Sequence, residues 1–142
     1  MLVGLDSDVI IELVSEAGIR HQATHASYES LLANGAEFVV TDHALLEAFS
    51  VLSRSPAPVR VAPAQAERML KQTLGSHRIA PIRAGLAWET IRHTVERGFL
   101  GGRVYDAIIA LATYEAGASA LLTWNVKHFL TVAPVGLEIR HP

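Results

Sequence analysis

The stretch EFVVTDHALLEAFSVLSR, residues 37–54, decides the fold class. Its first five residues, EFVVT, are mostly β-branched or aromatic, which favours a buried strand. Beyond Asp42 the apolar side chains recur at the spacing of a helix, so we predict a helix over 43–54. Parallel strands need a long crossover connection, usually a helix. A strand that passes directly into a helix is therefore typical of a parallel α/β sheet.

The same alternation of strands and helices extends in both directions along the chain. The segment RIAPIR is expected to be a short edge strand with Pro81 on its free side, because proline cannot donate to a strand ladder. Together the elements predict an α/β fold, a single domain over 1–142 whose parallel β-sheet is flanked by helices on both faces. We predict strands at 2–5, 37–41, 78–83, 120–124 and 137–140, and helices at 8–17, 20–33, 43–54, 64–74, 85–97 and 104–116.

Composition excludes several classes of protein. Half of the 142 residues are apolar and the net charge is −2, which is typical of a globular domain and not of a disordered chain. No apolar run reaches the ~18–20 residues of a membrane span, and Asp6 interrupts the N-terminus before a signal-peptide core can form. The chain has no cysteine, so any metal must be held by oxygen or imidazole ligands. We therefore expect a soluble protein that is neither exported nor inserted in a membrane, which fits the reducing cytoplasm.

The near-neutral total charge hides an asymmetry. Residues 54–103 contain nine Lys or Arg residues and three acids, a local charge of +6, so the remaining segments carry −8. A basic surface beside an acidic pocket suits an enzyme acting on phosphodiesters, because the basic rim holds the polyanion while the acids hold a metal. A solvated helical region explains the charge equally well.

Three acids stand at places where a parallel sheet gathers its chemistry, at the carboxyl ends of the strands. Asp6 follows the first strand, Glu47 lies in the second turn of the helix after the second strand, and Asp106 lies in the first turn of the helix before strand 120–124. Carboxylates brought together repel one another, and a divalent cation is the usual compensation. Each acid also has a structural explanation: Asp6 as a helix cap, Glu47 as a boundary residue, and Asp106 as an acid favoured by the helix dipole.

Further polar residues follow the same strand ends. Asn125 can ligate a metal through its amide oxygen or can cap the short turn VKHFL that follows it. The hydroxyl groups of Ser7 and Thr123 can hydrogen-bond the carboxylates. We expect Trp88 and Trp124 to pack in the core or between helices, and a role for Trp124 in stacking on RNA stays open because it adjoins Asn125.

Other common motifs are absent. His21 and His25 are four residues apart, but no HExxH pattern or third ligand accompanies them, so we expect surface histidines. The sequence also lacks the phosphate-binding GxxxxGK[ST] loop, the GxSxG elbow of hydrolases and the GxGxxG fingerprint of dinucleotide-binding proteins.

The sequence resembles the PIN-domain family and, more narrowly, the VapC-type toxins of bacterial toxin–antitoxin pairs. The resemblance spans nearly the whole chain and ends on a short terminal strand. Its matching pieces are VGLDSDVII (3–11), ALLEAFSVLSR (44–54) and RVYDAIIALATYEAGASALLTWNVKHF (103–129). It implies a parallel sheet flanked by helices and an endoribonuclease that depends on Mg²⁺ or Mn²⁺. It further implies an RNA substrate, a homodimer and a small antitoxin protein that covers the cleft.

By position, the resemblance implies that Asp6, Glu47 and Asp106 are the catalytic, metal-binding acids. Members of the family often have a fourth acid after the last internal strand. Here the corresponding positions hold Asn125, a candidate metal ligand, and His128, so the fourth carboxylate is missing. A metal held by the three acids would activate water and offset the charge that develops on the phosphate during in-line attack. Candidates for contacts to the RNA phosphates are Arg54, Arg103 and Lys127.

Two other functions are compatible with parts of the pattern. A PIN-like module that binds RNA without cutting it would account for the missing fourth acid. A phosphatase of the haloacid-dehalogenase type also begins with Asp-x-Asp after a strand, as at Asp6 and Asp8, but it would need a suitably placed lysine. The only lysines are Lys71 and Lys127.

Overall fold

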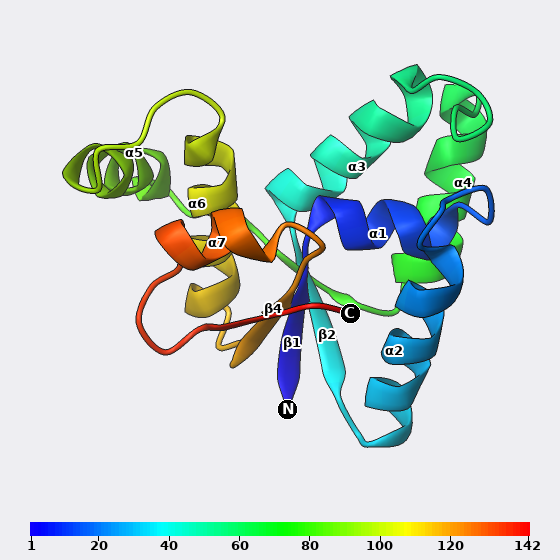
Figure 1. Ribbon diagram of the computed structural model, residues 1–142, viewed down its shortest axis with the longest axis horizontal. Coiled ribbons are helices and arrows are strands. Elements are labelled where there is room, and N and C mark those ends of the chain that lie inside the picture. The colour runs from blue at the N-terminus through cyan, green and yellow to red at the C-terminus, as the bar shows by residue number, and fades with distance from the viewer.

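The computed structural model describes all of residues 1–142 and contains five strands and seven helices (Figure 1). The first half of the chain confirms the predicted alternation, since each strand is followed by two helices. The elements in chain order are β1 (Leu2–Leu5), α1 (Ser7–Val14), α2 (His21–Ala33), β2 (Glu37–Thr41), α3 (Asp42–Arg54), α4 (Pro63–Leu74), β3 (Arg78–Ala80), α5 (Leu86–Glu96), α6 (Arg103–Glu115), β4 (Ala120–Leu122), α7 (Val126–Val132) and β5 (Glu138–Arg140).

All five strands form one parallel sheet in the order β3-β2-β1-β4-β5. In the central strand β1, Leu5 pairs with Val40 of β2 on one side and with Leu122 of β4 on the other. The chain first builds outward from β1 to β3 and then returns to build β4 and β5 on the opposite side. Open sheets of this kind bind ligands where the direction of building reverses. That point lies between the carboxyl ends of β1 and β4.

Helices cover both faces of the sheet, as the sequence predicted. Helices α1 to α4 lie on one side of the sheet and α5 to α7 on the other (Figure 1). Alternate residues of β2 reflect the two layers: Phe38 and Val40 belong to the main core, whereas Val39 packs in a smaller cluster with Ala80 and Ala118. No helix in the chain is both long enough and apolar enough to cross a bilayer.

Helix α6 packs closely against the centre of the sheet because Gly4 leaves room for it. A Cβ atom at this position of β1 would overlap the methyl group of Thr113 in α6. The small residue therefore brings α6 against β1. As a result the first turn of α6, which carries Asp106, lies near the end of β1.

Several element boundaries differ from the predictions. Helix α1 ends at Val14 and not at residue 17, because Ser15 leaves the helical conformation and accepts a hydrogen bond from Gly18 in a turn. Strand β3 ends at Ala80, so Pro81 follows the edge strand instead of lying within it. Residues 126–132 form a helix where we expected a short turn. Trp88 does not pack in the core: its side chain on α5 is 77% exposed.

Candidate functional site

Asp6 is held in place by donors from two strand ends. It is buried directly after β1, where it caps α1, and its Oδ1 accepts a hydrogen bond of 2.7 Å from the backbone N–H of Ser7. Its Oδ2 accepts a hydrogen bond of 2.7 Å from Thr123 Oγ1, just beyond β4. The Ser7 hydroxyl lies farther away, 3.5 Å from Oδ1. Both predicted supporting hydroxyls therefore lie beside Asp6, and Thr123 makes the stronger contact.

Asp8 is a site residue that the sequence analysis named only in the Asp-x-Asp of the phosphatase alternative. Its two carboxylate oxygens lie 3.2 and 3.1 Å from the backbone nitrogen of Trp124, which donates to them. The strand predicted over 120–124 ends at Leu122 because Thr123 and Trp124 turn to bond these two aspartates. The Asp-x-Asp spacing could have identified Asp8 from the sequence, because both acids directly follow β1, the strand that pairs with β4.

Glu47 and Asp106 approach the same edge from two different helices. Glu47 is half-buried on α3, and the Asp106 side chain, on α6, is 21% exposed. Asp106 Oδ2 lies 3.9 Å from His128 Nδ1. The three acids predicted from the sequence are therefore on elements that converge at the switch point of the sheet.

The pKa shifts show that these acids lie within reach of one another's charge. Burial raises the pKa of Asp6 well above its ordinary value, and the charges of Asp8 and then Glu47 raise it further, against the hydrogen bonds that it accepts. Burial also raises the pKa of Asp8.

Asp106 behaves in the same way. Burial raises its pKa, the charges of Glu47 and Asp8 add to that effect, and the nearby His128 and Arg103 oppose it. The four acids Asp6, Asp8, Glu47 and Asp106 are named here the acid cluster. Within it, mutual repulsion is only partly offset by groups of this chain.

The donor set of the acid cluster fits a hard divalent cation in its chemistry, since carboxylate oxygens are the ligands that such ions prefer. The side chains are not preassembled for coordination: no three Asp, Glu or His side chains stand close enough together to hold one ion. Asp6 and Asp8 instead accept hydrogen bonds from the residues after β4, while Asp106 faces His128. Thr123 and Trp124 thus orient two of the carboxylates, and a carboxylate oxygen keeps lone pairs that can bind a cation.

Asn125 does not cap α7 with its side chain, contrary to one of the two roles considered for it. Its Nδ2 lies 2.9 Å from His128 Nδ1, so the amide donates to the ring nitrogen. The two residues at the position of the missing fourth acid thus bond each other. The amide oxygen of Asn125 is the atom that remains to act as a metal ligand.

The three predicted phosphate contacts do not share one place. Arg103, at the start of α6, donates to Thr131 Oγ1 at 2.6 Å and so ties α6 to α7, and Lys127 is exposed in the first turn of α7. Arg54 is exposed at the far end of α3, seven residues and about 10 Å along the axis from Glu47. The basic segment 54–103 is also divided, since α4 and α5 lie on opposite sides of the molecule (Figure 1). It forms no single basic rim.

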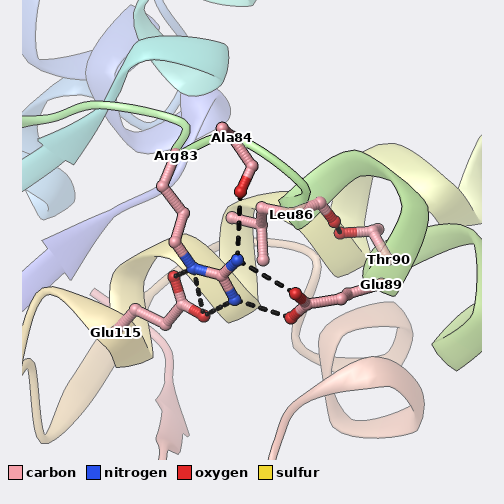
Figure 2. A network of polar contacts seen from close by, with 6 residues as sticks. All are labelled: Arg83, Ala84, Leu86, Glu89, Thr90 and Glu115. Atoms are coloured by element: carbon pink, nitrogen blue, oxygen red, sulfur yellow. Dashed lines mark hydrogen bonds and ion pairs between the residues drawn. The ribbon is translucent and has the colours of Figure 1, made fainter.

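A second group of charged residues lies away from the acid cluster, where α5 begins and α6 ends. Figure 2 shows the Arg83 guanidinium between the carboxylates of Glu89 and Glu115. Arg83 Nη2 lies 2.6 Å from Glu89 Oε2 and 2.7 Å from Glu115 Oε1. Hydrogen bonds from Arg83 lower the pKa of Glu89. Each of these carboxylates has a cation of the same chain at hydrogen-bond distance.

The chain is similar to proteins of a known family. The PIN domain model matches residues 3–132. The chain is 31% identical over 141 residues to ribonuclease VapC27 of Mycobacterium tuberculosis, covering 96% of this chain and 94% of the relative. It is 32% identical over 97 residues to ribonuclease VapC40 of the same organism, covering 68% and 71%.

Solved structures show the same fold at lower identity. VapBC2 from Rickettsia felis, bound to a DNA fragment from its promoter, matches with a TM-score of 0.74 and 19% identity, over 100% of this chain and 99% of the other. FitAB bound to the IR36 DNA fragment matches with a TM-score of 0.69 and 14% identity, over 100% and 95%.

Proposed function

The chain belongs to the PIN domain family, and on that premise we propose that it is a metal-dependent endoribonuclease that hydrolyses RNA phosphodiester bonds. The observation that carries the proposal is the acid cluster at the switch point between β1 and β4. Four carboxylates converge there without enough positive charge of their own chain to balance them. A similarity to a ribonuclease over nearly the whole chain supports the same conclusion.

We propose Mg²⁺ or Mn²⁺ as the cofactor, with Asp6, Glu47 and Asp106 as the catalytic ligands and the amide oxygen of Asn125 as a further one. A divalent cation at this place supplies positive charge for the phosphate and activates water. The support from the structure is the donor set, which offers oxygen atoms and a single imidazole. No cysteine is present to serve as a nucleophile, and the proposed reaction needs none.

The remaining residues of the site act on the carboxylates and on the substrate. Thr123 holds the Asp6 carboxylate, and the Trp124 backbone holds that of Asp8, so the end of β4 orients two acids that follow β1. Lys127 is the predicted phosphate contact that lies both exposed and beside the site. Arg103 is engaged with Thr131, so it orders the start of α6 and also reduces the negative charge near Asp106.

We also propose that the chain is the toxin of a toxin–antitoxin pair that acts in the cytoplasm as a homodimer with a small antitoxin partner. Similar solved structures include VapBC complexes from Rickettsia felis and from Haemophilus influenzae. If a small protein is encoded beside the chain, co-expression of the two, followed by size-exclusion chromatography with mass determination, checks the partner proposal. A single complex larger than either protein is expected, and separate elution of the two proteins would contradict a stable pair.

One alternative is favoured by a specific observation. Asn125 and His128 occupy the place of a fourth acid and bond each other, which suits a PIN-like module that binds RNA without cleaving it. The phosphatase alternative lacks such support, because Lys71 is paired with Glu67 on α4 and the exposed Lys127 forms no ion pair with the acid cluster.

The deciding experiment is cleavage of a mixed pool of structured RNA by the purified protein, with Mn²⁺, with Mg²⁺ and with a chelator. Asp106→Asn, prepared identically, is the matched variant. We expect cleavage that requires metal and disappears in the variant. Equal cleavage by both proteins would indicate a contaminating nuclease, and RNA binding without any cleavage would favour the alternative.

A further inference from the structure

The guanidinium of Arg20 is paired with no carboxylate, although the Glu12 carboxylate contacts the backbone of the same residue. It is exposed at the position just before α2, and it forms no salt bridge, whereas Lys71, Arg83 and Arg140 each pair with a glutamate. A cation at a helix N-terminus interacts unfavourably with the helix dipole. The stability of the helix therefore does not explain the position of this charge.

The backbone of Arg20 is nevertheless held firmly. Its N–H donates to Glu12 Oε2 at 2.9 Å, and its carbonyl accepts a hydrogen bond of 2.9 Å from the hydroxyl of Thr24, a fully buried residue. The Thr24 hydroxyl in turn accepts a hydrogen bond of 3.0 Å from Trp124 Nε1. This chain of bonds fixes Arg20 relative to the indole ring, and the guanidinium carbon lies over that ring, 4.9 Å from its centroid.

The stacked pair is attached directly to the acid cluster. The backbone N–H of Trp124 donates to the Asp8 carboxylate, and the ring of His141 borders the indole with centroids 5.6 Å apart. Lys127 follows Trp124 by three residues and is exposed in the first turn of α7. The Arg20–Trp124 pair therefore borders the acid cluster through Asp8.

We propose that Arg20, held on Trp124, binds an unpaired base of the substrate beside the bond to be cleaved, so that base, guanidinium and indole form one stack. This inference rests on the proposed ribonuclease function. A guanidinium is planar, and RNA-binding proteins stack unpaired bases on such planes as well as on aromatic rings. The guanidinium carbon lies over the indole ring, and the Arg20 side chain is exposed, so a base can reach it from the solvent. The site would select single-stranded segments, because a base in a duplex is not available for stacking.

The first test is steady-state cleavage, with Mn²⁺, of an oligonucleotide whose cleaved segment is unpaired. Arg20→Ala should raise KM by about tenfold, the size expected for losing one stacked base, and leave kcat within about twofold. Arg92→Ala is the matched control: it removes one exposed, unpaired arginine on α5, changes the net charge equally and should leave KM unchanged. Arg20→Lys should not restore KM, because an ammonium group keeps the charge but has no plane.

The second test does not depend on cleavage. Trp88→Phe leaves Trp124 as the only tryptophan, and Asp106→Asn is added to prevent turnover in Mg²⁺. The emission of Trp124 should change when the single-stranded oligonucleotide is added and should not change with the matched duplex. If the wild-type protein cleaves no RNA, the proposed function fails, whereas this emission still reports on the stack.

Three outcomes would overturn the inference while leaving the nuclease in place. These are equal KM values for Arg20→Ala and Arg92→Ala, full restoration of KM by Arg20→Lys, and an emission change that is the same for duplex and single strand. Restoration by lysine would show that Arg20 makes a charge contact with phosphate and no stack.

Discussion

The carboxylates of the acid cluster and those of the Arg83 group, Glu89 and Glu115, lie in opposite electrostatic environments. Glu89 and Glu115 share one guanidinium, and the pKa of Glu89 is lowered by it. Asp6 and Asp106 are more buried than Glu89. Their pKa values are raised, because burial and neighbouring acids disfavour their charged forms. The chain can evidently place an arginine between two acids.

The difference between the two regions indicates a structural role for the Arg83 group and a functional role for the acid cluster. At the junction of α5 and α6 the charges are matched by side chains of the same chain, and the result is a fixed contact between a loop and two helices (Figure 2). At the switch point between β1 and β4, acids are gathered without a matching cation, which lowers the stability of the folded chain. On the proposed function, the compensating positive charge comes from a bound divalent metal.

Neutralising one acid in each region should produce the largest contrast. Glu47→Gln is expected to lower metal-dependent RNA cleavage by at least about a hundredfold, because it removes one of the proposed metal ligands. Glu89→Gln should leave cleavage within about twofold, since its carboxylate only contacts Arg83. Initial rates at saturating Mn²⁺ check both variants, and comparable losses in the two would remove the distinction between the regions.

The contact that orients Asp6 should have the next largest effect. Thr123→Val removes the donor to a buried carboxylate, at a cost of about 1–3 kcal/mol in unfolding free energy. It should also weaken Mn²⁺ binding by about 10–100-fold, and Thr123→Ser should restore much of both. Thr94→Val, which removes a buried hydroxyl bonded only within α5, is the control. Denaturant unfolding and calorimetric titration measure the two effects, and equal Mn²⁺ affinity in Thr123→Val and the wild type would count against the orienting role.

The two regions should also respond oppositely to pH. The raised pKa of Asp106 means that the folded chain binds its proton more tightly than the unfolded chain, so Asp106 destabilises the metal-free protein once the pH exceeds that raised value. In chelator at pH 7, Asp106→Asn should therefore melt a few degrees above the wild type, and the gap should narrow as the pH falls. A gap that widens on acidification would show that the pKa is lowered in the fold.

For Glu89 the dependence of stability on pH has the opposite sign. Its pKa is lowered, so its favourable contact is present at neutral pH and is lost as the pH falls through the lowered value. The residue is exposed, so the effect is small. Arg83→Ala should accordingly cause the smallest change of this set, a slight decrease in melting temperature at neutral pH with no change in cleavage. A large loss of activity in Arg83→Ala would link the group to the site.

Local sequence patterns predicted the sheet well where one element is long or strongly β-branched. EFVVT became β2 with the predicted ends, and the helix expected over 104–116 formed one residue earlier, at Arg103–Glu115. Their apolar spacing is a local property, so it can be read without knowledge of the fold. Asp6, Glu47 and Asp106 could be placed at one edge because parallel topology alone brings strand ends together.

The features that the sequence did not predict depend on contacts between distant parts of the chain. Strand β4 ends two residues early because Thr123 and Trp124 bond aspartates that precede them by more than a hundred residues. Asp8 was missed for the same reason, since its partner is a backbone N–H across the sheet. Trp88 was misjudged because apolar character does not say which face of α5 a residue occupies, and at 77% exposure it lies on the solvent side.

The most direct test of the central claim is calorimetric titration of the purified protein with Mn²⁺ in the absence of RNA, for the wild type, Asp106→Asn and Glu89→Gln. We expect saturable binding by the wild type and by Glu89→Gln, and a large loss of affinity in Asp106→Asn. Binding that is absent from the wild type, or equal in all three proteins, would contradict the account that the acid cluster is where this chain takes up a cation.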